Sequence, residues 1–189
     1  MSNEFKDWLA ELANSPVKSK EWNRWLLYKY PWLTPSNVWS GKYITDCAGE
    51  NGDTGFWPGE PNAHPEYDYE FTWADSFPDG WWNNFGLQMC EEIEQCLREL
   101  PEENYRDFRI TDIKEKYGTL HFYTNWVTDK LNKIIYKYEN LSEHICIKCG
   151  KPATKVSCGW ISFYCDDCAP EGSITTPEFY RVDEEDNGG

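Results

Sequence analysis

Two short stretches, Cys146-Ile147-Lys148-Cys149-Gly150 and Cys165-Asp166-Asp167-Cys168, carry the clearest structural information in this chain. Two residues separate the cysteines of each pair, and fifteen residues, 150–164, separate the pairs. Two intervening residues allow one tight turn to point both sulfurs at the same cation. C-x2-C-x15-C-x2-C is the spacing of a four-thiolate zinc site. The predicted ligands of one Zn²⁺ are therefore Cys146, Cys149, Cys165 and Cys168.

Four thiolates complete a tetrahedral shell and leave no position for water or substrate, so this site is predicted to be structural. Gly150 relieves the first turn, and the residues between the pairs are expected to form a short hairpin. Iron suits the same cage, and two disulfides are formally allowed. A redox dithiol would need only one pair. The spacing favours zinc over iron. Cys158 lacks the C-x-x-C spacing and His144 is a lone histidine near the first pair, so neither is a predicted ligand.

The rest of the chain predicts a mixed fold. Apolar residues at helical spacing indicate helices over about 2–14, 19–30, 81–100 and 128–142, and Ser2, Ser19 and Asp79 are the predicted N-caps of the first three. Two β-rich runs, 108–113 and 120–123, flank a turn that contains Gly118 and predict a hairpin. The expected fold is α+β, with three to four helices around a small antiparallel sheet and a C-terminal zinc ribbon.

This pattern divides the chain into three parts. Residues 1–143 are predicted to form the α+β domain, which includes a long aromatic and acidic loop region over 31–80 and a short strand over 67–73. Residues 144–170 are the predicted zinc ribbon. Residues 171–189 are predicted to be a tail that is largely disordered at its end, because the last eight residues have little to bury.

Charge is concentrated in one part of the sequence. The 189 residues carry 33 acids and 18 Lys+Arg, a net charge of -15, and block 45–104 holds fifteen acids and one base, Arg98. Such a block repels phosphates, so direct binding to nucleic acid is disfavoured, and the excess of +4 in 105–160 is too small to argue otherwise. The block is either a solvated face or a docking surface for a basic partner protein, and mimicry of nucleic acid is a further alternative.

Candidates for catalysis are few. The histidines are His64, His121 and His144, and the sequence has no phosphate loop, dinucleotide fingerprint or G-x-S-x-G motif. A carboxylate cluster is conceivable at the start of the central helix, but the helix dipole alone favours acids there. Its members would be Asp75, Asp79, Glu91 and Glu92. An enzyme or small-ligand site lined by Trp57, Trp73 and His121 is kept as the alternative to a non-enzymatic binding protein.

The N-terminal residues 1–7 lack a basic segment followed by an apolar one, and no apolar run approaches the roughly 20 residues of a bilayer span. We therefore expect no secretory leader, no membrane contact and a cytoplasmic location.

The order of several motifs resembles a family of small uncharacterised proteins of bacteriophages and prophages. The resemblance covers about residues 75–168. It includes Asp79-Gly80-Trp81, Cys90-Glu91-Glu92-Ile93, the run Ile113–Tyr123, both cysteine pairs and Gly159-Trp160. It implies a phage origin and a host-cell cytoplasmic setting, with no activity attached. Small phage proteins of this class often bind a host protein, for example to counter defence systems, which implies an interaction role.

Overall fold

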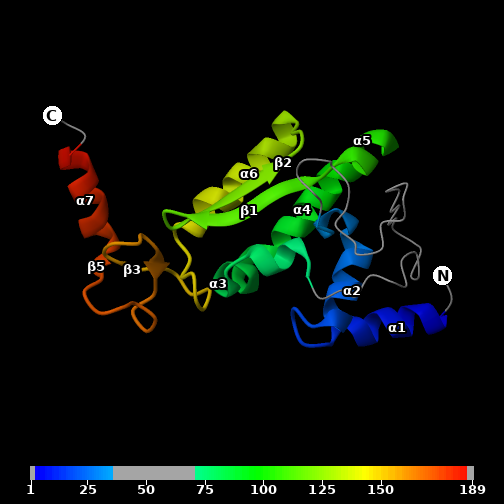
Figure 1. The fold of residues 1–189 in the computed structure, drawn as a ribbon, viewed down its shortest axis with the longest axis horizontal. Coiled ribbons are helices and arrows are strands. Elements are labelled where there is room, and N and C mark those ends of the chain that lie inside the picture. The colour runs from blue at the N-terminus through cyan, green and yellow to red at the C-terminus, as the bar shows by residue number, and fades with distance from the viewer. Residues whose placement is uncertain (1–2, 36–70, 187–189) are drawn as a thin grey trace. The chain divides into compact units, whose positions relative to one another are not determined.

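The computed structural model describes residues 3–35 and 71–186 (Figure 1). Over these residues the fold is mixed helix and sheet, as predicted, with two small sheets. Helices are more numerous there than the three or four expected. Contacts between residues group the chain into two compact units. Their boundaries differ from the boundary at 143/144 that the sequence suggested. Unit 1 holds 1–76, 97–112 and 123–127, whereas unit 2 holds 77–96, 113–122 and 128–189.

Unit 1 is built on two amphipathic helices, α1 (Asn3–Ala13) and α2 (Lys20–Lys29). The side chain of Ser19 caps α2 by accepting a hydrogen bond from the amide of Trp22 (3.2 Å), as the sequence predicted. Short 3-10 turns follow over η1 (Pro31–Leu33) and η2 (Trp73–Ser76), and a short helix, α5 (Glu102–Asp107), was not foreseen. Trp73 thus lies in a 3-10 turn, while most of the strand predicted over 67–73 lies outside the described residues.

Unit 2 contains a nearly continuous helix: α3 (Asp79–Trp81), the π-helical turn η3 (Trp82–Gly86) and α4 (Leu87–Arg98), whose last two residues belong to unit 1. The predicted central helix is thus present, but Pro78 rather than Asp79 holds its N-cap position. Helix α6 (Asp129–Ser142) packs beside it through the rings of Phe85 and Tyr138, whose centroids are 5.4 Å apart.

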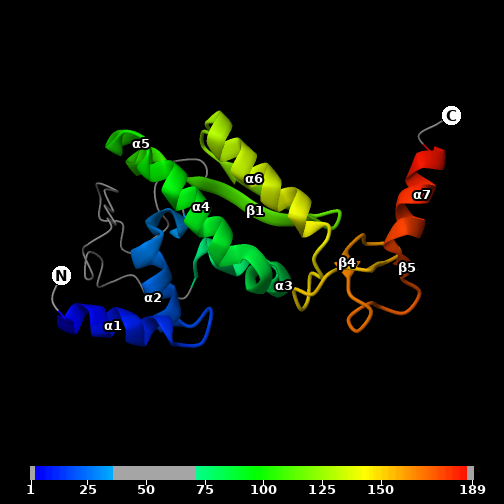
Figure 2. The same cartoon turned by 180° about the vertical axis from the view of Figure 1, so that it is seen from behind.

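The predicted hairpin is formed by β1 (Ile110–Lys116) and β2 (Thr119–Thr124). Its turn is only two residues long, Tyr117-Gly118, and both have positive φ (54° and 82°), as a tight two-residue turn requires. In unit 2, helix α6 runs alongside the hairpin in both views (Figures 1 and 2), and the side chain of Ser142 accepts a hydrogen bond from the amide of Leu120 (2.9 Å).

The second sheet has the order β4-β3-β5, with antiparallel pairs between β3 (Lys155–Val156) and both β4 (Phe163–Tyr164) and β5 (Ile174–Thr175). The short hairpin expected between the cysteine pairs is therefore present. Figure 2 shows β4 and β5 near the start of helix α7 (Thr176–Asp186).

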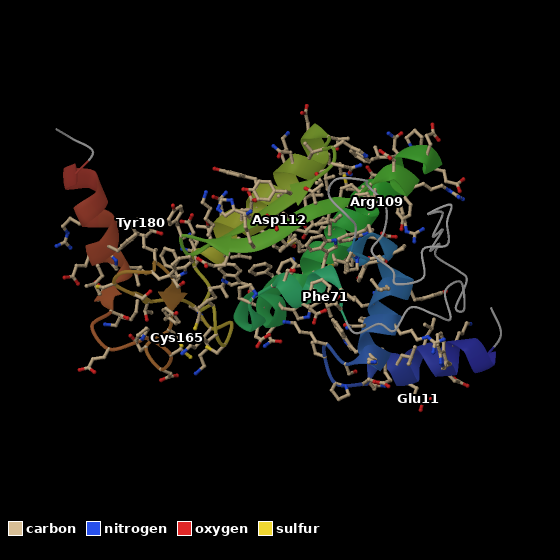
Figure 3. All side chains as sticks on the ribbon, viewed as in Figure 1. Glu11, Phe71, Arg109, Asp112, Cys165 and Tyr180 are labelled. Atoms are coloured by element: carbon tan, nitrogen blue, oxygen red, sulfur yellow. The ribbon has the colours of Figure 1, made fainter. Side chains whose placement is uncertain are left out.

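Helix α7 occupies much of the predicted tail, 171–189, and two local features account for it. Thr175 and Glu178 form a reciprocal capping box, in which each side chain accepts a hydrogen bond from the other's amide (both 3.4 Å). The rings of Phe179 and Tyr180 then lie 6.1 and 6.4 Å from that of Phe163, which gives the helix an apolar contact. Tyr180 is labelled in Figure 3.

No helix in the described ranges combines the length and apolar character needed to span a bilayer.

Candidate metal centre

The four predicted ligands meet in one place. The sulfurs of Cys146, Cys149, Cys165 and Cys168 all lie within 4.8 Å of one another, and those of Cys149 and Cys165 are 3.5 Å apart. In a tetrahedral thiolate shell with metal–sulfur distances of roughly 2.3 Å, the sulfurs sit about 3.8 Å apart. The cluster therefore has the dimensions to hold a metal ion. Cys165 is labelled in Figure 3.

Each cysteine pair forms its own backbone turn. In the first, the amide of Gly150 donates to the carbonyl of Cys146 (3.0 Å), and Gly150 has a φ of 79°, which favours glycine. In the second, the amides of Cys168 and Ala169 donate to the carbonyl of Cys165 (3.1 and 3.0 Å). Each turn is thus closed by its own backbone hydrogen bonds.

The sheet brings the two turns together. Antiparallel pairing places Phe163 opposite Val156, and the carbonyl of Phe163 accepts a hydrogen bond from the amide of Ile147 (3.0 Å) in the first turn. Because Cys165 follows β4 directly, this bond sets the second pair beside the first.

Hydrogen bonds to the sulfur of Cys146 favour its thiolate. Burial acts to raise the pKa of this thiol, but backbone amides of Cys165, Cys149 and Lys148 donate to it and together lower the pKa to about 7. The Cys165 and Cys149 thiols instead raise the pKa of Cys168 to about 12. Four adjacent thiolates repel one another, so complete deprotonation needs a cation among them.

Cations also lie at the rim of the cluster. Lys151 follows the first pair, and its Nζ is 2.8 Å from a carboxylate oxygen of Asp167 in the second. The hydrogen bond and charge of Asp167, together with the charge of Cys165, raise the pKa of Lys151. Both side chains are exposed, so solvent screens the ion pair and it contributes little to stability.

The first turn is seated on the helix of unit 2 by three hydrogen bonds. The amide of Gly80 donates to the carbonyl of Ile147 (3.0 Å), and the Trp81 indole donates to that of Ile145 (3.2 Å). The third runs from the Asn84 side chain to the carbonyl of Gly150 (2.7 Å). A Cβ on Gly80 would lie 2.1 Å from the carbonyl oxygen of Cys146, so only glycine permits this contact.

Sequence reasoning missed Gly80 and Asn84 as parts of the site. No spacing rule connects them with cysteines more than sixty residues away. The tripeptide Asp79-Gly80-Trp81 by itself predicts no contact with the cysteines.

The remaining candidates have other roles or lie elsewhere. Cys158 and His144 are exposed and outside the sulfur cluster, and the Cys158 sulfur lies 3.2 Å from the carbonyl of Gly172. The Nε2 of His121 lies 3.0 Å from the Thr119 hydroxyl. His121 belongs to unit 2 and Trp73 to unit 1, whereas Trp57 and His64 fall outside the described residues.

The proposed carboxylate cluster is divided as well. Asp75, in unit 1, accepts hydrogen bonds from the amide and hydroxyl of Thr72 (2.7 and 3.1 Å). Glu92, in unit 2, accepts from Lys137 (2.6 Å) and from the hydroxyl of Tyr138 (2.8 Å). These contacts give both acids a structural role.

No family model, curated protein or solved structure matches this chain.

Proposed function

We propose that Cys146, Cys149, Cys165 and Cys168 bind one structural Zn²⁺ and that residues 144–170 form a zinc ribbon. The main support is the clustering of all four sulfurs within 4.8 Å of one another. Four thiolates saturate a tetrahedral ion, so its role is to hold the two turns together. Such ions contribute on the order of 10 kcal/mol to folding in isolated zinc modules, which is comparable to the stability of a whole domain.

Elemental analysis of the purified protein tests the metal. We expect one equivalent of zinc in the wild type, its loss in Cys149→Ser, and its retention in the matched variant Cys158→Ser, whose sulfur lies outside the cluster. Replacement by Co²⁺ should give the absorption of a tetrahedral thiolate complex. Stoichiometric iron, or zinc retained by Cys149→Ser, would contradict this assignment.

We further propose that the protein is a non-enzymatic binding protein of the kind that bacteriophages encode, which acts in the host cytoplasm on a host protein with a basic surface. The support is the charge of block 45–104. Its described part, 71–104, has eight acids against Arg98. Asp79, Glu99, Glu102 and Glu103 are exposed there. Complementary charge of this density accelerates and orients association with a basic surface.

Affinity capture from a host lysate tests this interaction. The variant Glu99→Gln/Glu102→Gln/Glu103→Gln should capture the partner with a lower yield than the wild type. A control with neutralised acids elsewhere, Glu171→Gln/Glu178→Gln, should capture it normally. Equal capture yields from all three proteins would show that the acidic block does not contribute to the interaction.

A further inference from the structure

Two large aromatic side chains of unit 2 are mostly exposed to solvent. Trp160, in the loop between β3 and β4, is 74% exposed, and Tyr117, in the β1–β2 turn, is 68% exposed. Exposing a side chain of this size forgoes the free energy that burial would provide, about 25 cal/mol per Å². Exposed tryptophan and tyrosine on an ordered surface are typical of binding sites.

One carboxylate joins the two loops. An oxygen of Glu115 accepts a hydrogen bond from the amide of Gly118 (2.7 Å), and its other oxygen accepts from the Trp160 indole Nε1 (3.1 Å). The turn also packs closely on the β4 side, because a Cβ on Gly118 would lie 2.8 Å from the Phe163 ring. Tyr117 and Trp160 therefore belong to one surface, which we call the aromatic tip.

The segments around the aromatic tip contain more lysines than acids. Residues 113–123 and 144–168 together contain five lysines, Lys114, Lys116, Lys148, Lys151 and Lys155, against Glu115, Asp166 and Asp167, and Lys151 is paired with Asp167. The Nζ of Lys116 lies 5.3 Å from the centre of the Tyr117 ring, and that of Lys148 lies 5.8 Å from the Tyr164 ring. Aromatic faces and ammonium groups are thus presented together.

We propose that the aromatic tip binds single-stranded nucleic acid, with unpaired bases stacking on Trp160 and Tyr117 and phosphates contacting the lysines. The indole N–H already donates to Glu115, so the ring offers a partner its π-face. Flat bases use such faces, whereas an acidic peptide would need only the lysines. A duplex keeps its bases stacked on one another and presents no free base face to these rings.

The net charge of -15 and the excess of only +4 in residues 105–160 disfavour binding by charge alone, so the proposal rests first on the two exposed rings. The Debye length is about 8 Å at physiological ionic strength, so distant acids are largely screened while lysines in contact with phosphates are not. The proposal is also independent of the acidic block, since it concerns another surface and another class of partner.

Fluorescence anisotropy of the full-length, zinc-loaded protein with labelled dT12 and U12 oligomers tests the proposal. We expect Trp160→Ala and Tyr117→Ala to weaken binding at least 5-fold each, since stacking contributes roughly 1–3 kcal/mol per base. Tyr136→Ala is the matched control, because Tyr136 on α6 is 63% exposed and lies outside the aromatic tip. Its affinity should equal that of the wild type, and affinity should fall as salt increases.

A second pair of variants at Trp160 controls for misfolding. Trp160→Phe retains a ring and should keep most of the binding, whereas Trp160→Leu is apolar without a ring and should lose it, with zinc content measured for both. The proposal is wrong if neither oligomer binds, or if Trp160→Leu binds like Trp160→Phe. Equal binding of a duplex would also overturn the proposal, and so would equally effective competition by polyglutamate. Either result would mean that the lysines bind polyanions in general.

Discussion

At Gly80 the backbone of helix α3 touches the backbone of the first cysteine turn. The closest partner of an added methyl group would be a carbonyl oxygen, that of Cys146 at 2.1 Å, which cannot rotate away as a side chain could. Gly150 is also close from the other side, since its own Cβ would lie 2.7 Å from the carbonyl oxygen of Gly80. These two glycines allow the first cysteine turn to pack directly on a helix.

Gly80→Ala should therefore destabilise the protein, although alanine normally stabilises a helix relative to glycine by about 1 kcal/mol. We expect a net loss of roughly 2 kcal/mol or more in the free energy of unfolding, as for other forced core overlaps. Denaturant titration with Asn83→Ala as control measures it, because Asn83 is exposed in the following turn. A stabilised Gly80→Ala would contradict the close approach.

A second prediction at this scale concerns the side chain of Glu92. Burial acts to raise its pKa, but hydrogen bonds from Lys137 and Tyr138 outweigh this and hold the pKa below the ordinary value of 4.5. A lowered pKa in the folded state means that the ionised carboxylate stabilises the fold above pH 4.5. This contribution is lost as the pH falls through the folded-state pKa.

Glu92→Gln should thus cost about 1–2 kcal/mol at pH 7, because hydrogen bonds to a charged group are lost and the buried Tyr138 hydroxyl keeps a weaker acceptor. The difference from the wild type should shrink as the pH is lowered below 4.5. Thermal unfolding as a function of pH measures both effects. A difference that is independent of pH would exclude the ionised form as the stabilising one.

Among the elements, local rules explain what the sequence predicted and what it did not. Ser19 caps α2 as predicted, and Thr128 caps α6 in the same way, because capping depends on residues three positions apart. The cysteine pairs are equally local, so their convergence followed from spacing. Helix α7 was missed although Thr175 and Glu178 have capping-box spacing, since its apolar contact, Phe163, is not adjacent in sequence.

The π-helical turn η3 (Trp82–Gly86) could not be predicted for a different reason. Helical periodicity alone does not distinguish an α-turn from a π-turn. The turn carries Asn84, whose side chain reaches the carbonyl of Gly150. The sequence therefore predicted the four cysteines that cluster but not the surface that supports their first turn.

Removal of the metal should act first on the elements around it. We expect chelation, or Cys149→Ser, to unfold at least residues 144–170, because the short strands β3 and β4 have only two residues each and depend on the cysteine turns. Hydrogen exchange should show lost protection there and also over α3 and η3, where the first turn is seated. Cooperative unfolding that is identical with and without metal would contradict this dependence.

For the whole molecule, the contact units differ from the linear division suggested by the sequence. Unit 2 is assembled from three chain segments, 77–96, 113–122 and 128–189, and the cysteine segment shares it with α3 and most of α4. A fragment that begins at residue 144 would lack the three groups of the helix that donate hydrogen bonds to its first cysteine turn. These groups are Gly80, Trp81 and Asn84.

A fragment spanning residues 144–189 should therefore bind zinc more weakly than the full chain. Three hydrogen bonds are lost, each with a net value of about 1 kcal/mol, so the affinity should fall by a factor on the order of a hundred. Competition with a chromophoric chelator measures the ratio. Gly80→Ala in the full chain should lower the zinc affinity toward that of the fragment, because it disturbs the same contact between the helix and the first cysteine turn. Equal affinities of the fragment and the full chain would show that the ribbon folds as an independent module, and that its contacts with the helix follow metal binding without strengthening it.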